Sequence, residues 1–427
     1  MLTVRTNFMK NYTKFLLLGL SLIAANNANA SGYQLNEYSA TGLGRAFAGI
    51  GVVGDDYSAI SFNPAGMILK GTGGQLGLST VQMHSFVNGN MGLQTPNGNT
   101  DLPNRPYGKM NFYKFLPSGF AQYKINDRAV IGAGVYTPFG LASIYNKDWF
   151  GATHGVSTEL DVIDTAVGAA YKVTDQVTLG ASLIYRYVHG DLMNTLVPGN
   201  PGSHNRFDLD GWEWAYNFGI MYEPVKDTRF GVSYRLNTAQ KVTGDHTIKN
   251  VNPLVDGKYP GVSKMTLPNQ LLFSAYHKVN DKFGLSGAVR WTKWDVFDNF
   301  VMSSPSLNLN PTVVVPEKWK NTWTYSLGLD YYYSPEWTFR AGVSYDPTPI
   351  RDKFHRTVRI PDSTRYWATL GASYKAKNWQ LDVGYAHLFM AKGRTHETAN
   401  GLMGPTTIKA EHDNYSNMVG VQFQYNF

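Results

Sequence analysis

The chain has 427 residues with a formal net charge of +7, no cysteine, and an aromatic content of 14% beside a charged content of only 16%. Soluble domains average about 25% charged residues, so this balance argues against an ordinary cytosolic enzyme. The absence of cysteine excludes disulfide bonds and thiolate chemistry, and we expect no catalytic residue, no metal site, no cofactor and no nucleic-acid partner. The mild basic excess is weak support for an anionic ligand or for contact with lipid A.

An export signal opens the chain. Basic residues continue to Lys14, an apolar core spans residues 15–25, and Ala28-Asn29-Ala30 has the small-x-small form of a cleavage site. Residues 1–30 are therefore expected to be a signal peptide, with Ser31 as the mature N-terminus. Met9 is an alternative start to Met1.

Residues 31–73 show neither sustained strand alternation nor a long helical stripe, yet they are apolar enough to be buried. The glycines between Gly42 and Gly54 allow tight turns and close backbone approach in a crowded space. We expect this segment to be a plug, or hatch, inside a barrel, with Arg45, Asp55 and Asp56 paired to charges on the barrel wall. A lid made from long loops is the competing plug.

From Gln75 onward the pattern is strand and turn. Residues 415–427 alternate apolar and polar side chains, which suits either a soluble sandwich or an outer-membrane barrel. Aromatic residues cluster at both ends of the apolar faces of residues 212–222, 323–333 and 337–345. Rings in that position are typical of the two interfaces of a membrane, whereas a sandwich core would hold them centrally. The barrel is therefore favoured.

Connection lengths predict the number of strands. Six short polar turns alternate with seven longer segments rich in Gly, Pro and Asn, at residues 88–110, 138–157, 192–208, 241–262, 302–314, 347–362 and 391–405. Thirteen connections imply about fourteen strands, an even number that puts both termini at the short-turn end. The predicted fold is all-β, an antiparallel transmembrane barrel over residues 74–427, and its last strand should pair with its first near residues 75–87.

Several motifs resemble a known family. They are SGYQLNEYSATGLGRAFAG from Ser31, Asn63-Pro64-Ala65, YTPFG at 136–140, IPDSTRYWATLGASY and LDVGYAHL. In order and along the whole mature chain they are similar to the long-chain fatty acid outer-membrane transporter (FadL) family, including its aromatic-hydrocarbon branch. The resemblance implies a fourteen-stranded barrel with a hatch and a route for hydrophobic molecules that leaves sideways through a gap at a kink in the third strand.

The resemblance also assigns roles to residues. Tyr33 corresponds to the aromatic position that reaches an internal pocket, and Asn63-Pro64-Ala65 corresponds to the hatch motif that lies against the kink. Pro138-Phe139-Gly140 corresponds to the kink itself, and a proline without an N–H makes a break in strand pairing natural. An ordinary strand end at Pro138 is the alternative.

Ligand recognition is divided between two regions. The family's pocket arginine in the fifth strand falls at Asn194, which is uncharged, while Lys320 matches a basic position in the tenth strand and is the carboxylate-binding candidate. Phe139, Leu141, Trp149 and Phe150 are expected to form an exposed outer capture groove. The alternative is that these side chains cover one another.

The predicted function is uptake of hydrophobic small molecules, with long-chain fatty acids as the first cargo and aromatic or other neutral hydrocarbons as the alternative. A general porin and an outer-membrane lipase are weighed against it, but the hatch opposes the first, and no Ser–His motif supports the second. We expect a monomer in the outer membrane of a Gram-negative bacterium, in contact with membrane lipid and lipopolysaccharide.

Overall fold

The structure is a computed structural model that describes residues 32–95, 98–102, 106–307, 313–401 and 404–427. The predicted signal peptide and Ser31 lie outside the described residues. Among those described, no helix combines the length and the apolar character needed to cross a membrane.

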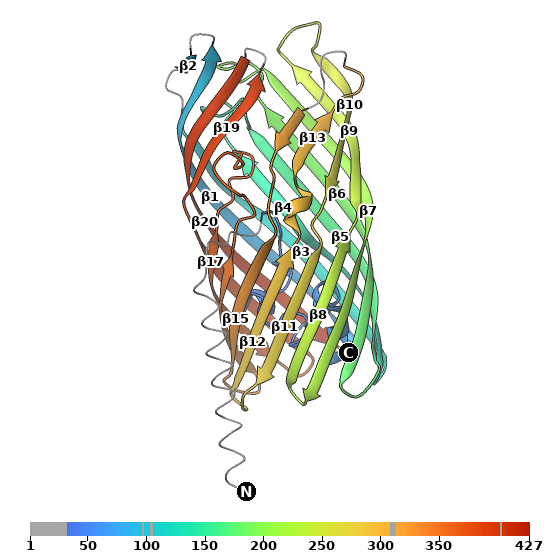
Figure 1. The fold of residues 1–427 in the computed structure, drawn as a ribbon. Helices are drawn as coiled ribbons and strands as arrows, with labels where there is room; N and C mark the ends of the chain where they lie inside the picture. The colour runs from blue at the N-terminus through green and yellow to red at the C-terminus, as the bar shows by residue number, and fades with distance from the viewer. Residues whose placement is uncertain (1–31, 96–97, 103–105, 308–312, 402–403) are drawn as a thin grey trace.

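The elements are a few short helices followed by strands (Figure 1). The helices are α2 (Ala40–Gly44), α3 (Ala59–Phe62), η2 (Pro64–Leu69) and η3 (Trp294–Val296). The strands are β1 (Gly73–Thr95), β2 (Gly98–Asp101), β3 (Gly108–Asn126), β4 (Ala129–Ile144), β5 (Ser157–Lys172), β6 (Val177–Asn194), β7 (His204–Val225), β8 (Thr228–Asn237), β9 (Ala239–Lys249), β10 (Gly257–Thr266), β11 (Gln270–Lys278), β12 (Phe283–Thr292), β13 (Asn299–Ser303), β14 (Val313–Pro316), β15 (Thr322–Tyr332), β16 (Trp337–Asp346), β17 (Arg365–Lys375), β18 (Trp379–Met390), β19 (Gly393–Gly401) and β20 (Gly404–Asn426).

These segments form one closed antiparallel barrel. Six of its strands are interrupted and consist of two consecutive segments: β2 with β3, β8 with β9, β10 with β11, β12 with β13, β14 with β15, and β18 with β19. The described barrel therefore has fourteen strands, as predicted. β1 pairs with β20 from Gly73 opposite Asn426 to Leu93 opposite Thr406, so the last strand closes the barrel on the first.

Several segments predicted as long loops are strand. β9 and β10 occupy most of residues 241–262, and β19 and the start of β20 occupy most of the described part of residues 391–405. These hairpins extend beyond the apolar band and carry polar side chains on both faces. Without apolar alternation they have no sequence signature of a strand, although the number of connections was still correct.

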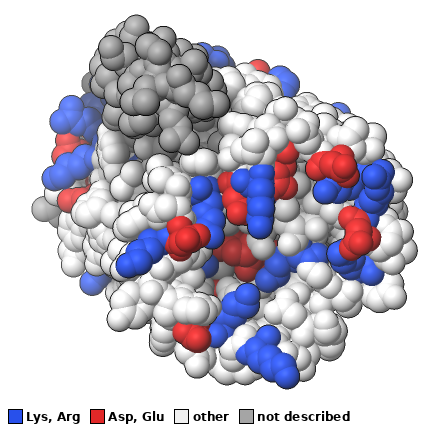
Figure 2. Space-filling view, turned by 90° about the horizontal axis from the view of Figure 1, so that it is seen from below, with Lys and Arg blue, Asp and Glu red and all other residues white. Residues whose placement is uncertain are grey.

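The outer wall is apolar and the inner wall is polar. Alternate residues point outward and stay exposed, among them Trp212, Trp214, Trp323, Trp337 and Trp379. At the short-turn end, Lys and Arg side chains lie interspersed with Asp and Glu (Figure 2). This distribution fits a barrel whose sides contact lipid and whose ends contact water.

Residues 32–72, here called the N-terminal segment, lie inside the barrel and are almost completely buried. Ser39 caps α2 by accepting a hydrogen bond from the Gly42 N–H, and Asn63 caps η2 through the Ala65 N–H. The wall supplies glycine where the segment touches it, since a methyl group on Gly219 would come within 2.0 Å of Asn63 Oδ1. The segment is therefore fitted closely to this wall.

Buried ion pairs also hold the N-terminal segment. Arg45 Nη1 lies 2.9 Å from Asp330 Oδ1 on β15, and Arg340 Nη2 on β16 lies 3.0 Å from Asp55 Oδ2. Arg45 and Asp55 also bond to each other at 2.7 Å. The expected pairing with charges on the wall is confirmed for Arg45 and Asp55, whereas Asp56 accepts hydrogen bonds from Ser39, Thr41 and Ser58 of its own segment.

Candidate functional site

The barrel wall has a gap between β3 and β4. These strands pair only from Gly119 opposite Val135 to Asn126 opposite Ala129, near the short-turn end. From that point toward the long-loop end β3 and β4 no longer pair with each other. The described residues of β3 have ladder partners on β1, and those of β4 have ladder partners on β5. A bulge in β4 between Tyr136 and Phe139 marks the separation.

The N-terminal segment pairs with β4 where β3 has left it. Gln34 forms an antiparallel bridge with Phe139. The Leu35 N–H donates to the Pro138 carbonyl, and the Gly140 N–H donates to the Tyr33 carbonyl, both at 2.9 Å. These bonds satisfy backbone groups that the gap would leave unpaired. The start of the N-terminal segment therefore acts as a short substitute strand at the break.

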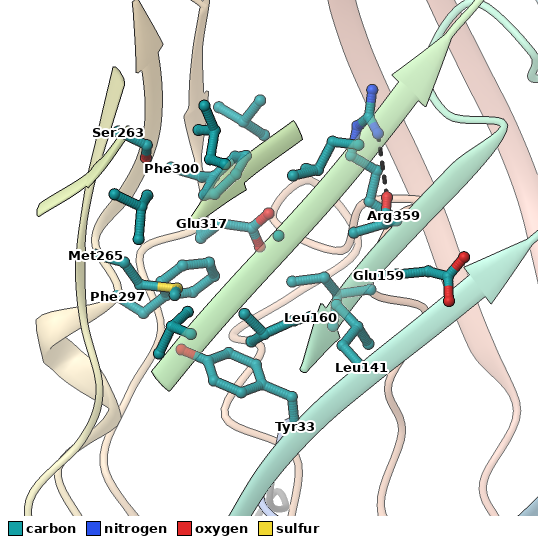
Figure 3. Close-up of a pocket in the computed structure, with 18 residues that line it drawn as sticks. Tyr33, Leu141, Glu159, Leu160, Ser263, Met265, Phe297, Phe300, Glu317 and Arg359 are labelled. Carbon is teal, nitrogen blue, oxygen red and sulfur yellow. Dashed lines mark hydrogen bonds between the residues drawn. The ribbon is translucent and has the colours of Figure 1, made fainter. Parts of the chain in front are cut away.

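Above this bridge lies an inner cavity of about 60 Å³ (Figure 3). Its lining is mostly aliphatic and aromatic and comes from the N-terminal segment, from β4 to β7, and from segments at the long-loop end. The lining residues are Tyr33, Leu141, Thr158, Glu159, Leu160, Val188, Gly190, Leu192, Leu209, Val242, Ser263, Met265, Phe297, Phe300, Val315, Glu317, Arg359 and Ile360. The lining suits a hydrophobic ligand that makes few polar contacts, and a long acyl chain would have to widen this cavity on entering.

Tyr33 forms the floor of the inner cavity within a cluster of rings. Its ring centroid lies 4.9 Å from that of Trp294, 5.7 Å from Phe297 and 5.6 Å from Trp319. Its hydroxyl is buried and has no hydrogen-bond partner among the described residues. An unpaired buried hydroxyl costs about 1–3 kcal/mol, so a ligand oxygen at this position would be favoured.

Arg359 supplies the cation of the inner cavity. It is only 8% exposed, and its guanidinium donates to Thr158 Oγ1 and to Asn194 Oδ1, each at 3.1 Å. No described carboxylate lies within ion-pair distance of it. A buried charge without a counter-ion is costly, and an anionic ligand would remove that cost.

Glu317 is the acid of the inner cavity. It lies on the loop side of the aromatic band that begins at Trp323, and its carboxyl accepts hydrogen bonds from Trp319 Nε1 at 2.9 Å and Thr357 Oγ1 at 3.3 Å. Burial raises the pKa of Glu317 to about 8 and lowers the pKa of Arg359 to about 10. At neutral pH the acid is therefore mostly uncharged while the guanidinium stays protonated.

A second cavity, of about 130 Å³ and here called the wall cavity, runs from the bridge into the wall gap. It is lined on the inside by Tyr33 and Leu35 and on the outside by Phe115, which is 64% exposed on the lipid-facing side of β3. Tyr33 and Leu141 line both cavities. These two side chains are therefore the partition between the inner cavity and the gap.

Comparison with known proteins identifies this architecture. Residues 21–427 match the family described as outer membrane protein transport protein (OMPP1/FadL/TodX). The chain belongs to this family. FadL-family members are transport proteins of the outer membrane rather than enzymes, and this chain is accordingly an outer-membrane transport protein for hydrophobic substrates.

Individual FadL-family relatives match over their whole length. Outer membrane protein P1 of Haemophilus influenzae is 27% identical over 468 residues, covering 98% of this chain and 100% of that protein. The long-chain fatty acid transport protein of Escherichia coli K12 is 25% identical, covering 97% of this chain and 99% of its own. The crystal structure of a Pseudomonas aeruginosa FadL homologue superposes with a TM-score of 0.84 at 24% identity, covering 93% of this chain and 100% of that one, and shows the same fold.

Within this FadL-type barrel, two expectations about position need correction. Asn63-Pro64-Ala65 does not lie at the wall break. Asn63 Nδ2 donates to the Ile220 carbonyl on β7, and a methyl group on Gly180 of β6 would come within 2.3 Å of the Ala65 nitrogen. The part of the N-terminal segment that meets the break is its beginning, where Gln34 pairs with Phe139.

The predicted outer groove is also different. Trp149 is fully buried and Phe150 is 4% exposed, and both pack with Tyr145 under the long loops instead of facing solvent. Phe139 is likewise fully buried beside Tyr33, while Leu141 lines the inner cavity. Trp149 and Phe150 therefore follow the alternative interpretation of the sequence, in which these side chains cover one another.

The basic residue expected at Asn194 comes from elsewhere in the chain. Arg359, in the long connection between β16 and β17, reaches Asn194 and donates a hydrogen bond to it. Lys320 lies just before β15, is half-buried, and does not line the inner cavity. Sequence reasoning missed Arg359 because it treated residues 347–362 as an external loop. It missed Glu317 because that residue lies in the break between β14 and β15, where strand alternation does not apply. The sequence signal that could have indicated Arg359 is its position directly before the apolar residues Ile360 and Pro361.

Proposed function

We propose that this protein takes up long-chain fatty acids across the outer membrane. The acyl chain binds in the inner cavity with its carboxylate at Arg359, and the ligand then leaves sideways through the gap between β3 and β4 into the membrane. In this reading the N-terminal segment is a hatch that must release its bridge to β4. The observation that carries the proposal is the buried guanidinium of Arg359, without a described counter-ion, in a cavity whose other walls are nearly all apolar.

The contacts around Arg359 favour a carboxylate. Its described partners are neutral oxygens, the side chains of Thr158 and Asn194 and the carbonyls of Ser157 and Met193, so an incoming carboxylate would not need to displace an acidic side chain. A hydrogen bond between charged groups contributes about 1.5–3 kcal/mol. The unpaired Tyr33 hydroxyl, on the floor of the same cavity, is a second possible donor to the ligand.

The side exit follows from the two cavities. A ligand passing from one to the other must displace Tyr33 and Leu141, and moving Tyr33 breaks the bridge to β4. Release of the chain into water would cost about 0.8 kcal/mol for each CH₂ group. Release through the gap keeps the acyl chain buried, because the outer end of that path is the lipid-facing side of β3.

Neutral or aromatic hydrocarbons are the second candidate cargo, favoured by the predominantly apolar lining. The function is tested by uptake in cells that lack other routes for fatty acids, with a labelled long-chain fatty acid and an alkylbenzene of equal length offered separately. Saturable uptake of the fatty acid at the higher rate is the expected result. Uptake of the alkylbenzene alone would contradict the proposed cargo and support the alternative.

The pH dependence of binding follows from Glu317. Below a pH of about 8 its carboxyl is neutral, and above it the new negative charge opposes an anionic ligand. Affinity for an alkyl sulfonate, which stays ionised throughout, should therefore fall on the order of tenfold as the pH rises from 7 to 9.5, since unit charges about 10 Å apart interact by about 1.7 kcal/mol at a dielectric constant of about 20. Calorimetry at each pH measures it.

Glu317→Gln is the matched control for this titration. The variant should keep the affinity that the wild type has for the sulfonate at pH 7 throughout the series, and a neutral alkylbenzene should bind either protein without dependence on pH. A decline that persists in Glu317→Gln would assign the titration to another group.

Contact of the outer wall with membrane lipid and lipopolysaccharide, and a monomeric state, remain part of the proposal. The exposed apolar side chains on the outer face, with tryptophans toward their ends, support the lipid contact.

A further inference from the structure

The gap between β3 and β4 contains an ion pair that the route described so far does not use. Lys114 Nζ on β3 lies 2.5 Å from Glu159 Oε2 on β5. In the order of the sheet β4 lies between these two strands, so the pair reaches past β4 at the height where β4 has separated from β3.

Small residues on β4 make room for this pair. Ala142 is the ladder partner of Glu159, and Gly140 is the partner of Asp161, so both lie on the face over which the Lys114 side chain extends. Lys114 lines the wall cavity, and Glu159 lies on the face of β5 opposite to Leu160, with its carboxylate directed away from the inner cavity (Figure 3). The ion pair therefore lies on the gap side of the Tyr33 and Leu141 partition.

The wall cavity has two described cations, and they differ in how firmly they are paired. Arg365 Nη2 lies 2.6 Å from Asp362 Oδ1, a carboxylate only 3% exposed, and also donates to the Gly32 carbonyl. The Lys114 and Glu159 side chains are 36% and 29% exposed. An ion pair with that exposure is worth little, so another anion can replace Glu159 at low cost.

The other charges in the gap sharpen this contrast. Asp161 lines the same cavity two residues from Glu159. Without Lys114, the side of the gap formed by β5 would carry two acidic groups and would oppose an anionic head group, while a neutral ligand would be unaffected.

We propose that Lys114 is a second carboxylate site, which exchanges Glu159 for the head group of a fatty acid as the ligand moves from the inner cavity into the wall gap. The inference rests on the side exit of the proposed function. It assigns the fatty acid two successive cations, Arg359 inside and Lys114 in the wall, so that its charge is compensated along the path.

Uptake rates in cells test the proposal, with a labelled fatty acid and an alkylbenzene of equal length. Lys114→Met should lower fatty-acid uptake by about tenfold or more, the scale of a charge-assisted hydrogen bond, and leave alkylbenzene uptake and equilibrium binding in the inner cavity unchanged. Lys114→Met/Glu159→Gln should show a smaller loss, because one repelling charge is also gone. Glu159→Gln alone should raise fatty-acid uptake by freeing Lys114.

A matched control lies on the same strand. Lys124 pairs with Asp127 at 2.7 Å at the short-turn end, away from the gap, and Lys124→Met/Asp127→Asn should change neither uptake rate. Equal loss of both cargoes in Lys114→Met would show that the ion pair is only a structural brace, and wild-type rates for both would remove Lys114 from the path. Either result would leave the proposed function standing if wild-type cells still take up the fatty acid.

Discussion

Replacing Arg359 with methionine should lower the affinity for a long-chain fatty acid by roughly 10- to 100-fold, the effect of losing charge-assisted hydrogen bonds worth about 1.5–3 kcal/mol. The affinity for a neutral alkylbenzene should stay the same or rise slightly, because an apolar side chain then replaces a buried charge. Quenching of tryptophan fluorescence by a brominated fatty acid measures the first affinity, since Trp294 and Trp319 lie beside Tyr33.

Two comparisons make this result specific. Arg359→Lys keeps a positive charge and should recover part of the lost affinity, which a purely structural role for the guanidinium would not give. Lys320→Met should have the smaller effect, because Lys320 lies outside the inner cavity. If Lys320→Met lowers the affinity for the fatty acid more than Arg359→Met does, the carboxylate site is at Lys320, as the family resemblance suggests. Equal losses for acid and alkylbenzene in Arg359→Met would contradict any carboxylate role.

A disulfide between the N-terminal segment and β4 should stop uptake. Gln34 and Phe139 face each other as an antiparallel pair without hydrogen bonds of their own, where Cα atoms are typically about 4.5 Å apart, within the range a disulfide requires. The chain has no cysteine, so Gln34→Cys/Phe139→Cys introduces one defined crosslink. Oxidised cells should take up fatty acid at the background rate, and reductant should restore uptake within the same culture.

The reduced double variant is the control for the loss of the Phe139 ring, and each single cysteine variant should be insensitive to oxidation. Fatty-acid binding to the purified oxidised protein should persist, because the inner cavity lies above the bridge. If the oxidised variant, with its disulfide fully formed, takes up fatty acid as fast as the reduced variant does, the bridge need not open. That result would exclude the side exit past Tyr33.

The fold was predictable because two features that define it are visible in short stretches of sequence. Apolar alternation with rings at both ends marks each membrane-crossing strand, and polar turns separate the strands, so the number of strands follows from residues such as Trp212 and Trp323 and from the turns between them. Boundaries at the long-loop end were not predictable, because hairpins such as β9 with β10 lie outside the lipid and carry no apolar stripe.

The site was predictable only in part. Tyr33 and the break at Pro138 were found because a proline interrupts a ladder by itself and because the start of the N-terminal segment is a distinctive motif. Arg359 and Glu317 were missed because their roles depend on how a long connection and the break between β14 and β15 fold back into the barrel. A residue's spacing along a strand indicates which way it points, but spacing in a loop does not.

The seam between β1 and β20 has a consequence for how the protein is assembled. It joins residues from opposite ends of the chain, such as Gly73 and Asn426, so it can form only after the last strand has been synthesised. Contacts this distant in sequence form slowly, because the chain loses the entropy of loop closure before strand pairing contributes any stabilising free energy. The N-terminal segment is continuous with β1 and touches wall strands as late as β20, where the Ala40 N–H donates to Gln422 Oε1 at 3.1 Å. Its contacts therefore include strands on both sides of the seam. We expect the wall to close last, around contents that are already in place, because the N-terminal segment is synthesised before the last strand.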